Sequence, residues 1–208
     1  MKDRIFQTGA TATITEVLNF ALTLEYLEDE FYKAGLAASG LIPSGDRAIF
    51  AQISQHETAH VNLLKGALGV NAIAKPTFDF TAGGSFPTVF TSYATFLALS
   101  QGFEDTGVRA YKGQATALMS DDATLTTALQ IHSVEARHAA QVRRLRGQKG
   151  WITFNMTDVS ALAAVYAGED THVQGGVEVG TTAAASEAFD EPLTMSEVLA
   201  IAGPFITG

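Results

Sequence analysis

The sequence predicts an all-α protein: an antiparallel four-helix bundle with one long crossover, followed by a C-terminal, mostly irregular extension. Apolar residues recur at helical spacing in four stretches between residues 13 and 147. The stretches come in two pairs, each joined by a short turn, and residues 70–87, which contain Pro and Gly, separate the pairs. Short turns join antiparallel neighbours, and a long segment can cross over the bundle. We therefore assign residues 1–147 to the bundle and 148–208 to an extension that packs on it or on a partner subunit.

Local signals set the ends of the first two helices. Thr13 and Glu16 have the spacing of a capping box, so the first helix begins near Thr13. Residues 40–44 form a short turn, in which Ser44 is a candidate N-cap for the second helix. Gly69 then stops that helix.

The second pair has similar signals. The third helix is expected over residues 87–117, and Asp121 or Asp122 caps the fourth, which ends before Gly147. Beyond it the chain is rich in Gly, Thr, Val and Ala, and only residues 194–197 carry a short helical signal. The extension therefore reveals little of its own chemistry.

Composition excludes several classes of protein. A hydrophobic content of 47% with 17% charged residues is that of a globular chain rather than a disordered one. The net charge of −9, without a Lys/Arg-rich stripe, argues against a nucleic-acid partner. No apolar run is long enough for a membrane span. The absence of cysteine excludes disulfides and thiolate-bound iron.

The first residues bear on localisation. Residues 1–6 are mixed and polar and lack the apolar core of a secretory signal. We therefore expect a cytoplasmic protein by default, or an exported or periplasmic one if a leader has been removed.

Each of the four helical stretches carries metal-ligand residues, in the order Glu, Glu-x-x-His, Glu, Glu-x-x-His. Residues three apart share one face of a helix, so each Glu-x-x-His can direct a carboxylate and an imidazole at one point. This is the pattern of ferritin-like bundles that hold two iron or manganese ions. Buried carboxylates also require a compensating positive charge. We expect two metal ions, Fe or Mn, with six ligands: Glu25, Glu57, His60, Glu104, Glu135 and His138.

The two halves of the chain repeat this pattern at nearly equal spacing. Glu25 precedes Glu57 by 32 positions, and Glu104 precedes Glu135 by 31. Each interval accommodates one helix, a turn and the start of an antiparallel partner. The sequence therefore predicts two related helical hairpins, each supplying half of the site.

Roles within the site follow from the pairing. Glu57 and Glu135 are the expected bridges and catalytic centre, with the other two glutamates and both histidines as terminal ligands. Tyr32 and Tyr111 each follow a lone Glu by seven residues, so their hydroxyls either bond to a ligating carboxylate and join the catalytic set, or pack as ordinary core tyrosines.

Other polar residues near these motifs are expected to play no part. Glu28 and Asp29 fit a solvated helix edge better than an alternative carboxylate. His56 should point away from the site, and His132 has no counterpart in the first half. A solvated loop is expected at His172, Glu169 and Asp170.

Three segments carry a resemblance to a known family. Residues 18–28, 103–108 and 134–138 resemble the ferritin-like proteins of the desiccation-related family, found in plants and bacteria. The resemblance spans about residues 13–147 and continues at residues 188–193. It implies the ferritin-like four-helix fold and, by position, the six ligands. Members are associated with stress, while the wider superfamily includes ferroxidases, peroxidases, manganese catalases and oxygenases, so the fold alone does not select an activity.

The leading hypothesis is a di-metal oxidoreductase (catalase-, peroxidase- or ferroxidase-like) that handles peroxide or dioxygen in stress protection. The alternatives are a non-catalytic stress protein stabilised by its metal, iron storage, and an oxygenase whose pocket is lined by Phe96, Leu99 or Phe103. A homo-oligomer, most simply a dimer, is also expected.

Overall fold

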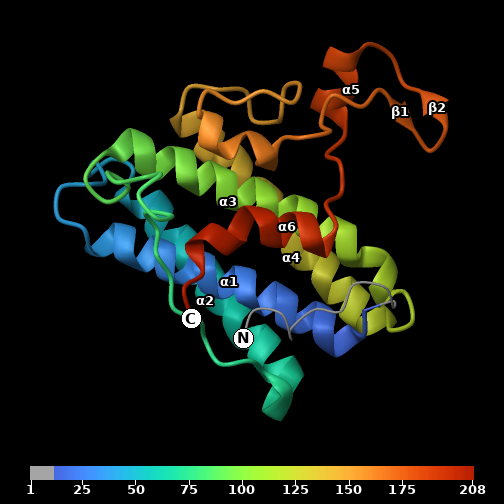
Figure 1. Ribbon diagram of the computed structural model, residues 1–208, viewed down its shortest axis with the longest axis horizontal. Helices are drawn as coiled ribbons and strands as arrows, with labels where there is room; N and C mark the ends of the chain where they lie inside the picture. The colour runs from blue at the N-terminus through green and yellow to red at the C-terminus, as the bar shows by residue number, and fades with distance from the viewer. Residues whose placement is uncertain (1–11) are drawn as a thin grey trace.

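A computed structural model describes residues 12–208 of the protein, so the expectations about residues 1–6 lie outside the described part. Four long helices form a bundle (Figure 1), which confirms the predicted all-α fold. They are α1 (Ile14–Ala37), α2 (Arg47–Leu68), α3 (Tyr93–Gln114) and α4 (Asp122–Leu145). Over residues 12–208, no helix has both the length and the apolar character needed to span a membrane.

The helix ends follow capping chemistry, with two corrections. Thr13 caps α1 in a complete capping box with Glu16, as predicted. Ser44 does not cap α2: the amides of Asp46 and Arg47 both donate to the Pro43 carbonyl, at 3.0 and 3.1 Å, so the turn continues and Asp46 takes the N-cap position.

The predicted start of α3 at residue 87 is also wrong. Residues 88–92 form a further turn, closed by the Ser92 amide on the Thr88 carbonyl at 2.8 Å. Ser92 then caps the helix by accepting from the Thr95 amide. Short 3₁₀ turns follow α2 and α3, at η2 (Gly69–Asn71) and η3 (Ala115–Leu118). Asp121 caps α4 as expected.

The bundle is two hairpins, α1 with α2 and α3 with α4, joined by the crossover. Helix α1 contacts α3, whereas α2 and α4 meet through side chains such as His56 and His138, without the close packing found inside each hairpin. The core has two apolar clusters. On α2, the first cluster includes Phe50 and Ile53, which precede Glu57, and the second includes Val61 and Leu64, which follow it. The Glu-x-x-His motif therefore lies between two apolar layers.

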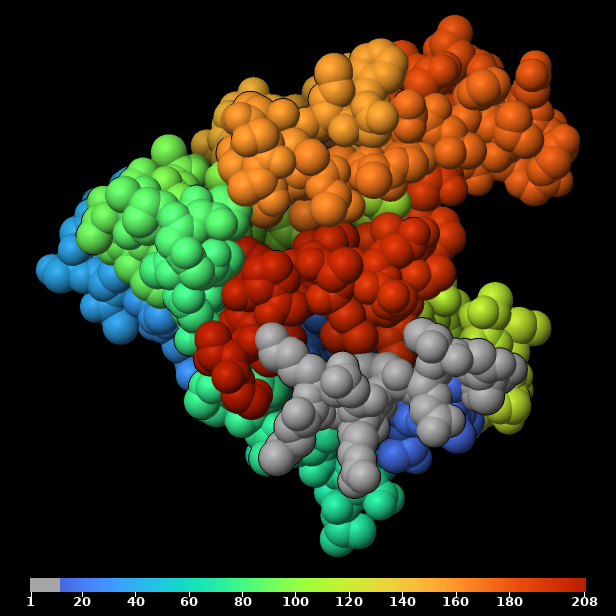
Figure 2. All heavy atoms as spheres, viewed as in Figure 1, coloured from blue at the N-terminus to red at the C-terminus, as the bar shows by residue number. Residues whose placement is uncertain are grey.

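The extension contains more regular structure than the sequence indicated. It comprises η4 (Ser160–Val165), the hairpin β1 (Val173–Gln174) with β2 (Val177–Glu178), α5 (Thr182–Ala188), α6 (Met195–Ala202) and η5 (Gly203–Phe205). Only α6 was anticipated, through Thr194 and Glu197, which form a second capping box. In Figure 2 the extension, coloured orange to red, covers much of the face shown.

Arg109 of α3 anchors the extension to the bundle. Its guanidinium donates to the carbonyls of Glu191, Val165 and Ala167, and Nε lies 2.8 Å from Glu169 Oε1. Because Arg109 is only 1% exposed, these contacts are shielded from water. The backbone of the extension also packs directly against α3 at Gly113, where a Cβ would lie 1.9 Å from the Leu193 carbonyl oxygen.

The end of the chain pairs with the crossover. The Asp79 amide donates to the Phe205 carbonyl at 2.8 Å, and the Thr207 amide donates to the Thr77 carbonyl at 2.9 Å. Thus the segment that joins the two hairpins is held by the end of the extension.

Candidate metal centre

The structure brings the six predicted ligands together in the middle of the bundle. Each helix supplies its expected side chains: one Glu each from α1 and α3, and a Glu-x-x-His pair each from α2 and α4. All four glutamates are 0% exposed. His138 is also buried, whereas the side chain of His60 is 12% exposed.

The donor atoms form two overlapping groups. Glu25 and His60 belong to one group and Glu104 and His138 to the other, while Glu57 and Glu135 belong to both. Within each group the donor atoms all lie within 4.8 Å of one another. This arrangement has the form of a dinuclear site with two shared carboxylates.

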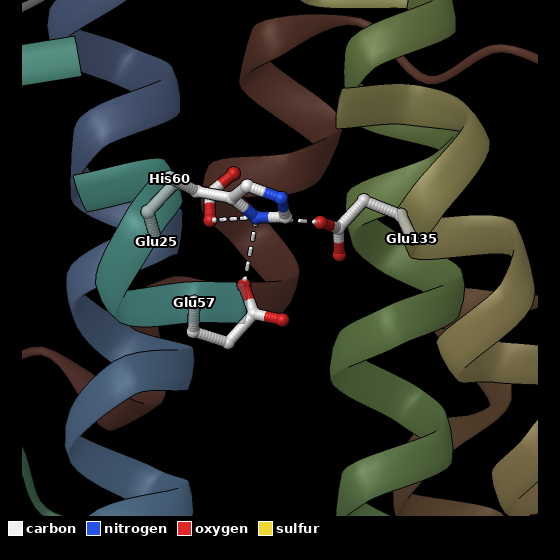
Figure 3. Close-up of side chains that lie close together, drawn as sticks. All are labelled: Glu25, Glu57, His60 and Glu135. Atoms are coloured by element: carbon white, nitrogen blue, oxygen red, sulfur yellow. Dashed lines mark hydrogen bonds and ion pairs between the residues drawn. The ribbon is translucent and has the colours of Figure 1, made fainter. Parts of the chain in front are cut away.

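A single ring nitrogen faces three carboxylates in the first group (Figure 3). Nδ1 of His60 lies 3.1 Å from an oxygen of Glu25, 3.1 Å from one of Glu57 and 3.2 Å from one of Glu135. One N–H cannot satisfy three acceptors from different directions. A cation placed among the imidazole and the three carboxylates can bind all four groups, because each of them would direct a lone pair at it.

The second group has the same character. Nδ1 of His138 lies 2.9 Å from Glu57 Oε1 and 3.2 Å from Glu104 Oε2. Glu57 Oε1 and both oxygens of Glu135 nevertheless make no hydrogen bond of acceptable geometry with any described residue. Buried carboxylate oxygens without donors are costly, so these residues fit a pair of metal ions.

Burial and crowding alter the acidity of the site. Burial raises the pKa of Glu57 to about 8, and the nearby Glu135 carboxylate adds to the rise. The pKa of Glu135 is also raised to about 8, by burial and then by Glu25. For His138 burial acts in the opposite direction, but the carboxylates of Glu104 and Glu57 outweigh it and raise its pKa to about 11. Without a cation, the centre therefore retains protons at neutral pH.

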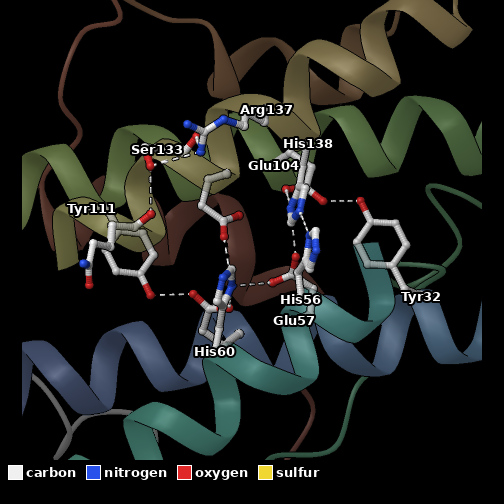
Figure 4. Close-up of polar contacts among 12 residues, drawn as sticks. Tyr32, His56, Glu57, His60, Glu104, Tyr111, Ser133, Arg137 and His138 are labelled. Carbon is white, nitrogen blue, oxygen red and sulfur yellow. Dashed lines mark hydrogen bonds and ion pairs between the residues drawn. The ribbon is translucent and has the colours of Figure 1, made fainter. Parts of the chain in front are cut away.

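The two tyrosines bond to ligands across the bundle rather than within their own helices. Tyr32 of α1 donates to Glu104 of α3, and Tyr111 of α3 donates to Glu25 of α1 (Figure 4). Helical side chains lean toward the N-terminus of their own helix. In neighbouring antiparallel helices, a tyrosine and a glutamate therefore lean toward each other. Both hydroxyls contact candidate ligands, so the tyrosines are more than core packing.

His56 contradicts its prediction. It was expected to point away from the site, but its Nδ1 lies 2.9 Å from His138 Nε2, and the two rings stack with centroids 5.2 Å apart. Gln52 in turn lies 2.8 Å from the other ring nitrogen of His56. His138 therefore contacts His56 through Nε2 and the ligand carboxylates through Nδ1. The prediction for His56 was wrong because it relied only on its position next to Glu57 in the sequence.

The predicted solvated edge of α1 is buried. Glu28 is 3% exposed and Asp29 is 4% exposed. Asp29 accepts from Thr58, within the first Glu-x-x-His motif, and pairs with Lys33, in each case at 2.6 Å. Burial raises the pKa of Glu28 well above its ordinary value, and the nearby Glu135 is the next cause. The helical spacing from Glu25 was the signal that could have identified Glu28.

The other polar residues that were expected to play no part have mixed outcomes. His132 belongs to neither metal-capable group. Asp170 and His172 are exposed as expected, whereas Glu169 is fully buried against Arg109, so its predicted solvated position is wrong.

The bundle contains an apolar cavity of about 230 Å³ at the Tyr111 end of the site. The oxygenase hypothesis placed a pocket at Phe96, Leu99 or Phe103, and none of these three lines this cavity. Phe96 and Leu99 pack in the apolar core, whereas Phe103 lines two smaller cavities of about 10 and 130 Å³. Side chains of all four long helices form the walls of the larger cavity, including Phe20, Leu64, Ala110 and Ala128.

Comparison with known families decides the affiliation. A family described as "Ferritin-like domain" matches residues 13–148. The chain belongs to this family. The match covers the four long helices and all six candidate ligands of the ferritin-like domain. No curated protein matches the chain.

Proposed function

We propose that this chain is a dinuclear ferritin-like metal protein that uses iron or manganese to process peroxide or dioxygen in stress protection. One observation carries the proposal: buried carboxylates from all four helices converge with two imidazole Nδ1 atoms, and three of their oxygens accept no hydrogen bond of acceptable geometry from residues 12–208. Bound there, a pair of iron or manganese ions would supply redox chemistry toward these small molecules.

The protein's contribution is to hold and orient that pair. Glu57 and Glu135 would contact both ions because they belong to both donor groups. Glu25 with His60 and Glu104 with His138 would complete the two coordination sets. The tyrosines and His56 would fix the orientation of these ligands, as outer partners do in other metal sites.

The partial exposure of His60 supports an approach for small molecules from the side between α2 and α4. Apolar layers on either side of the motif would exclude bulk water from the rest of the centre.

Elemental analysis of purified protein is the direct test. About two irons or two manganeses per chain are expected: manganese would direct the work to catalase assays, and iron to ferroxidase and peroxidase assays. Glu57→Ala should abolish both metal content and turnover. Glu178→Gln is a suitable control because Glu178 is exposed and lies in the extension. Peroxide consumption that survives in Glu57→Ala would refute the assignment.

A non-catalytic role for the metal is the second candidate, and one observation favours it. Glu57 comes from the first hairpin and Glu135 from the second, so ions shared between them would cross-link the two halves. This role predicts a large loss of melting temperature on chelation, with negligible peroxide or dioxygen turnover by the loaded protein.

We also propose a link to desiccation stress and a homodimer. The resemblance of residues 18–28, 103–108 and 134–138 to desiccation-related proteins supports the first. Exposed apolar side chains on α2 and α4, Leu63 (43%) and Leu129 (49%), support the second. Size-exclusion chromatography with light scattering tests the dimer, and a mass of about 22 kDa in solution would refute it.

A further inference from the structure

Glu28 lies one helical turn beyond Glu25 on α1. It is 3% exposed, and among the described residues its side chain makes no hydrogen bond or ion pair. Leaving a buried acidic group unpaired is costly. Such a residue in a folded core calls for a partner, and residues 12–208 do not provide one.

Glu28 belongs to neither group of converging donor atoms, but its carboxylate lies near that of Glu135. A Cβ at Gly107 of α3 would lie 3.1 Å from Glu135 Oε2 and 3.5 Å from Glu28 Oε1. The two oxygens therefore flank the same small space beside α3. Among the described residues, neither oxygen of Glu135 accepts a hydrogen bond of acceptable geometry, although Oε1 lies 3.2 Å from His60 Nδ1.

The internal repeat shows how this space arises. Glu25 corresponds to Glu104 and Tyr32 to Tyr111, so Glu28 corresponds to Gly107. Glycine within a helix costs about 1 kcal/mol relative to alanine. At this position it removes the side chain that would otherwise stand between Glu28 and Glu135. The site is therefore asymmetric, with an additional carboxylate contributed by the first hairpin only.

We propose that Glu28 is a seventh protein ligand, which binds an iron or manganese ion together with Glu135. This inference rests on the proposed dinuclear site. Four carboxylates balance the charge of two divalent ions, and a fifth favours a more highly charged pair. Glu28 thereby biases the centre toward its oxidised state.

The test is metal binding rather than activity. Wild type and Glu28→Gln are titrated with Mn(II) by calorimetry and with Co(II), whose visible spectrum reports the ligand set. We expect two ions in the wild type, a loss of about tenfold or more in the affinity for one ion in Glu28→Gln, and a changed Co(II) spectrum. Glu30→Gln is the matched control, because Glu30 lies on the same helix but pairs with Lys75 at the surface.

Two further variants guard against a general structural effect. Glu28→Asp retains the charge but shortens the reach, so it should lose affinity as Glu28→Gln does. Gly107→Ala places a methyl group 3.1 Å from Glu135 Oε2 and should weaken the same ion while Glu28 is intact. Far-UV circular dichroism of each metal-free variant should match that of the wild type.

The outcomes are distinguishable. If the wild type binds two ions and Glu28→Gln binds both with unchanged affinity and spectrum, Glu28 is not a ligand, although the dinuclear site stands. Wild-type affinity in Glu28→Asp together with a loss in Glu28→Gln would also overturn ligation, in favour of a purely electrostatic effect. If the wild type binds no metal, the proposed function and this inference both fail.

Discussion

Glu57→Gln should stabilise the metal-free protein, although it removes a central ligand. Burial and the neighbouring Glu135 raise the pKa of Glu57 from 4.5 to about 8. A group whose pKa is higher in the folded than in the unfolded state favours folding below its unfolded pKa. That contribution is lost as pH rises through the folded value. At pH 7 most of this stabilising contribution is already lost in the wild type. Glutamine cannot ionise, so the variant does not suffer this loss.

The size of the effect follows from the shift. Each pKa unit corresponds to about 1.4 kcal/mol, and pH 7 lies about 2.5 units above the unfolded value, which gives roughly 3 kcal/mol as an upper value. For a chain of this length, 1 kcal/mol moves the melting temperature by about 2–4 °C. Glu57→Gln is therefore expected to melt up to roughly 6–12 °C higher than the wild type at pH 7.

Scanning calorimetry of chelator-treated protein provides the assay. The difference should shrink toward zero near pH 4.5, and it should reverse sign at pH 7 once Mn(II) is added, because only the wild type retains the complete ligand set. Glu178→Gln controls for the loss of one negative charge at an exposed position. A metal-free Glu57→Gln protein that melts below the wild type at pH 7 would refute the reasoning.

Three further predictions concern the surroundings of the site. Tyr111→Phe removes the hydrogen bond to Glu25 and should weaken Mn(II) binding about tenfold, and an unchanged titration would count against this role. Arg109→Met leaves the Glu169 carboxylate buried without its cation and should cost about 3–5 kcal/mol, with the extension cleaved before the bundle in limited proteolysis. Burial raises the pKa of Glu169 to about 7 despite Arg109, so this group favours the docked extension below about pH 4.5 and loses that effect as pH rises through 7. Proteolysis of the extension should therefore accelerate between pH 5 and pH 8 in the wild type but not in Glu169→Gln, and equal acceleration would contradict this account.

The helices and the convergence of the six side chains could be predicted because both depend on local spacing. A Glu and a His three residues apart share a helical face whatever surrounds them. Capping residues such as Thr13 and Asp121 mark helix ends through hydrogen bonds only three residues long. These signals can be recognised in the sequence because they involve residues that are close together in the chain.

Contacts between distant segments could not be predicted in this way. The stacking of His56 on His138 joins residues 82 positions apart, and the crossed tyrosine bonds depend on how α1 lies beside α3. The burial of Glu169 depends on Arg109, a residue of another helix that carries no motif. Glu28 differs, because its spacing of three residues from Glu25 is a local signal that places both residues on the same face of α1.

The crossed tyrosine bonds bear on how such a chain could have arisen. Because Tyr32 of the first hairpin orients Glu104 of the second, and Tyr111 reciprocates on Glu25, neither hairpin can arrange its own ligands alone. A single ancestral hairpin of this kind would have needed a second copy before its carboxylates were held in place. Duplication and fusion would convert that requirement into a property of one polypeptide. Each half would then be free to diverge, and the glutamate at position 28 and the glycine at position 107 are such a difference between corresponding positions.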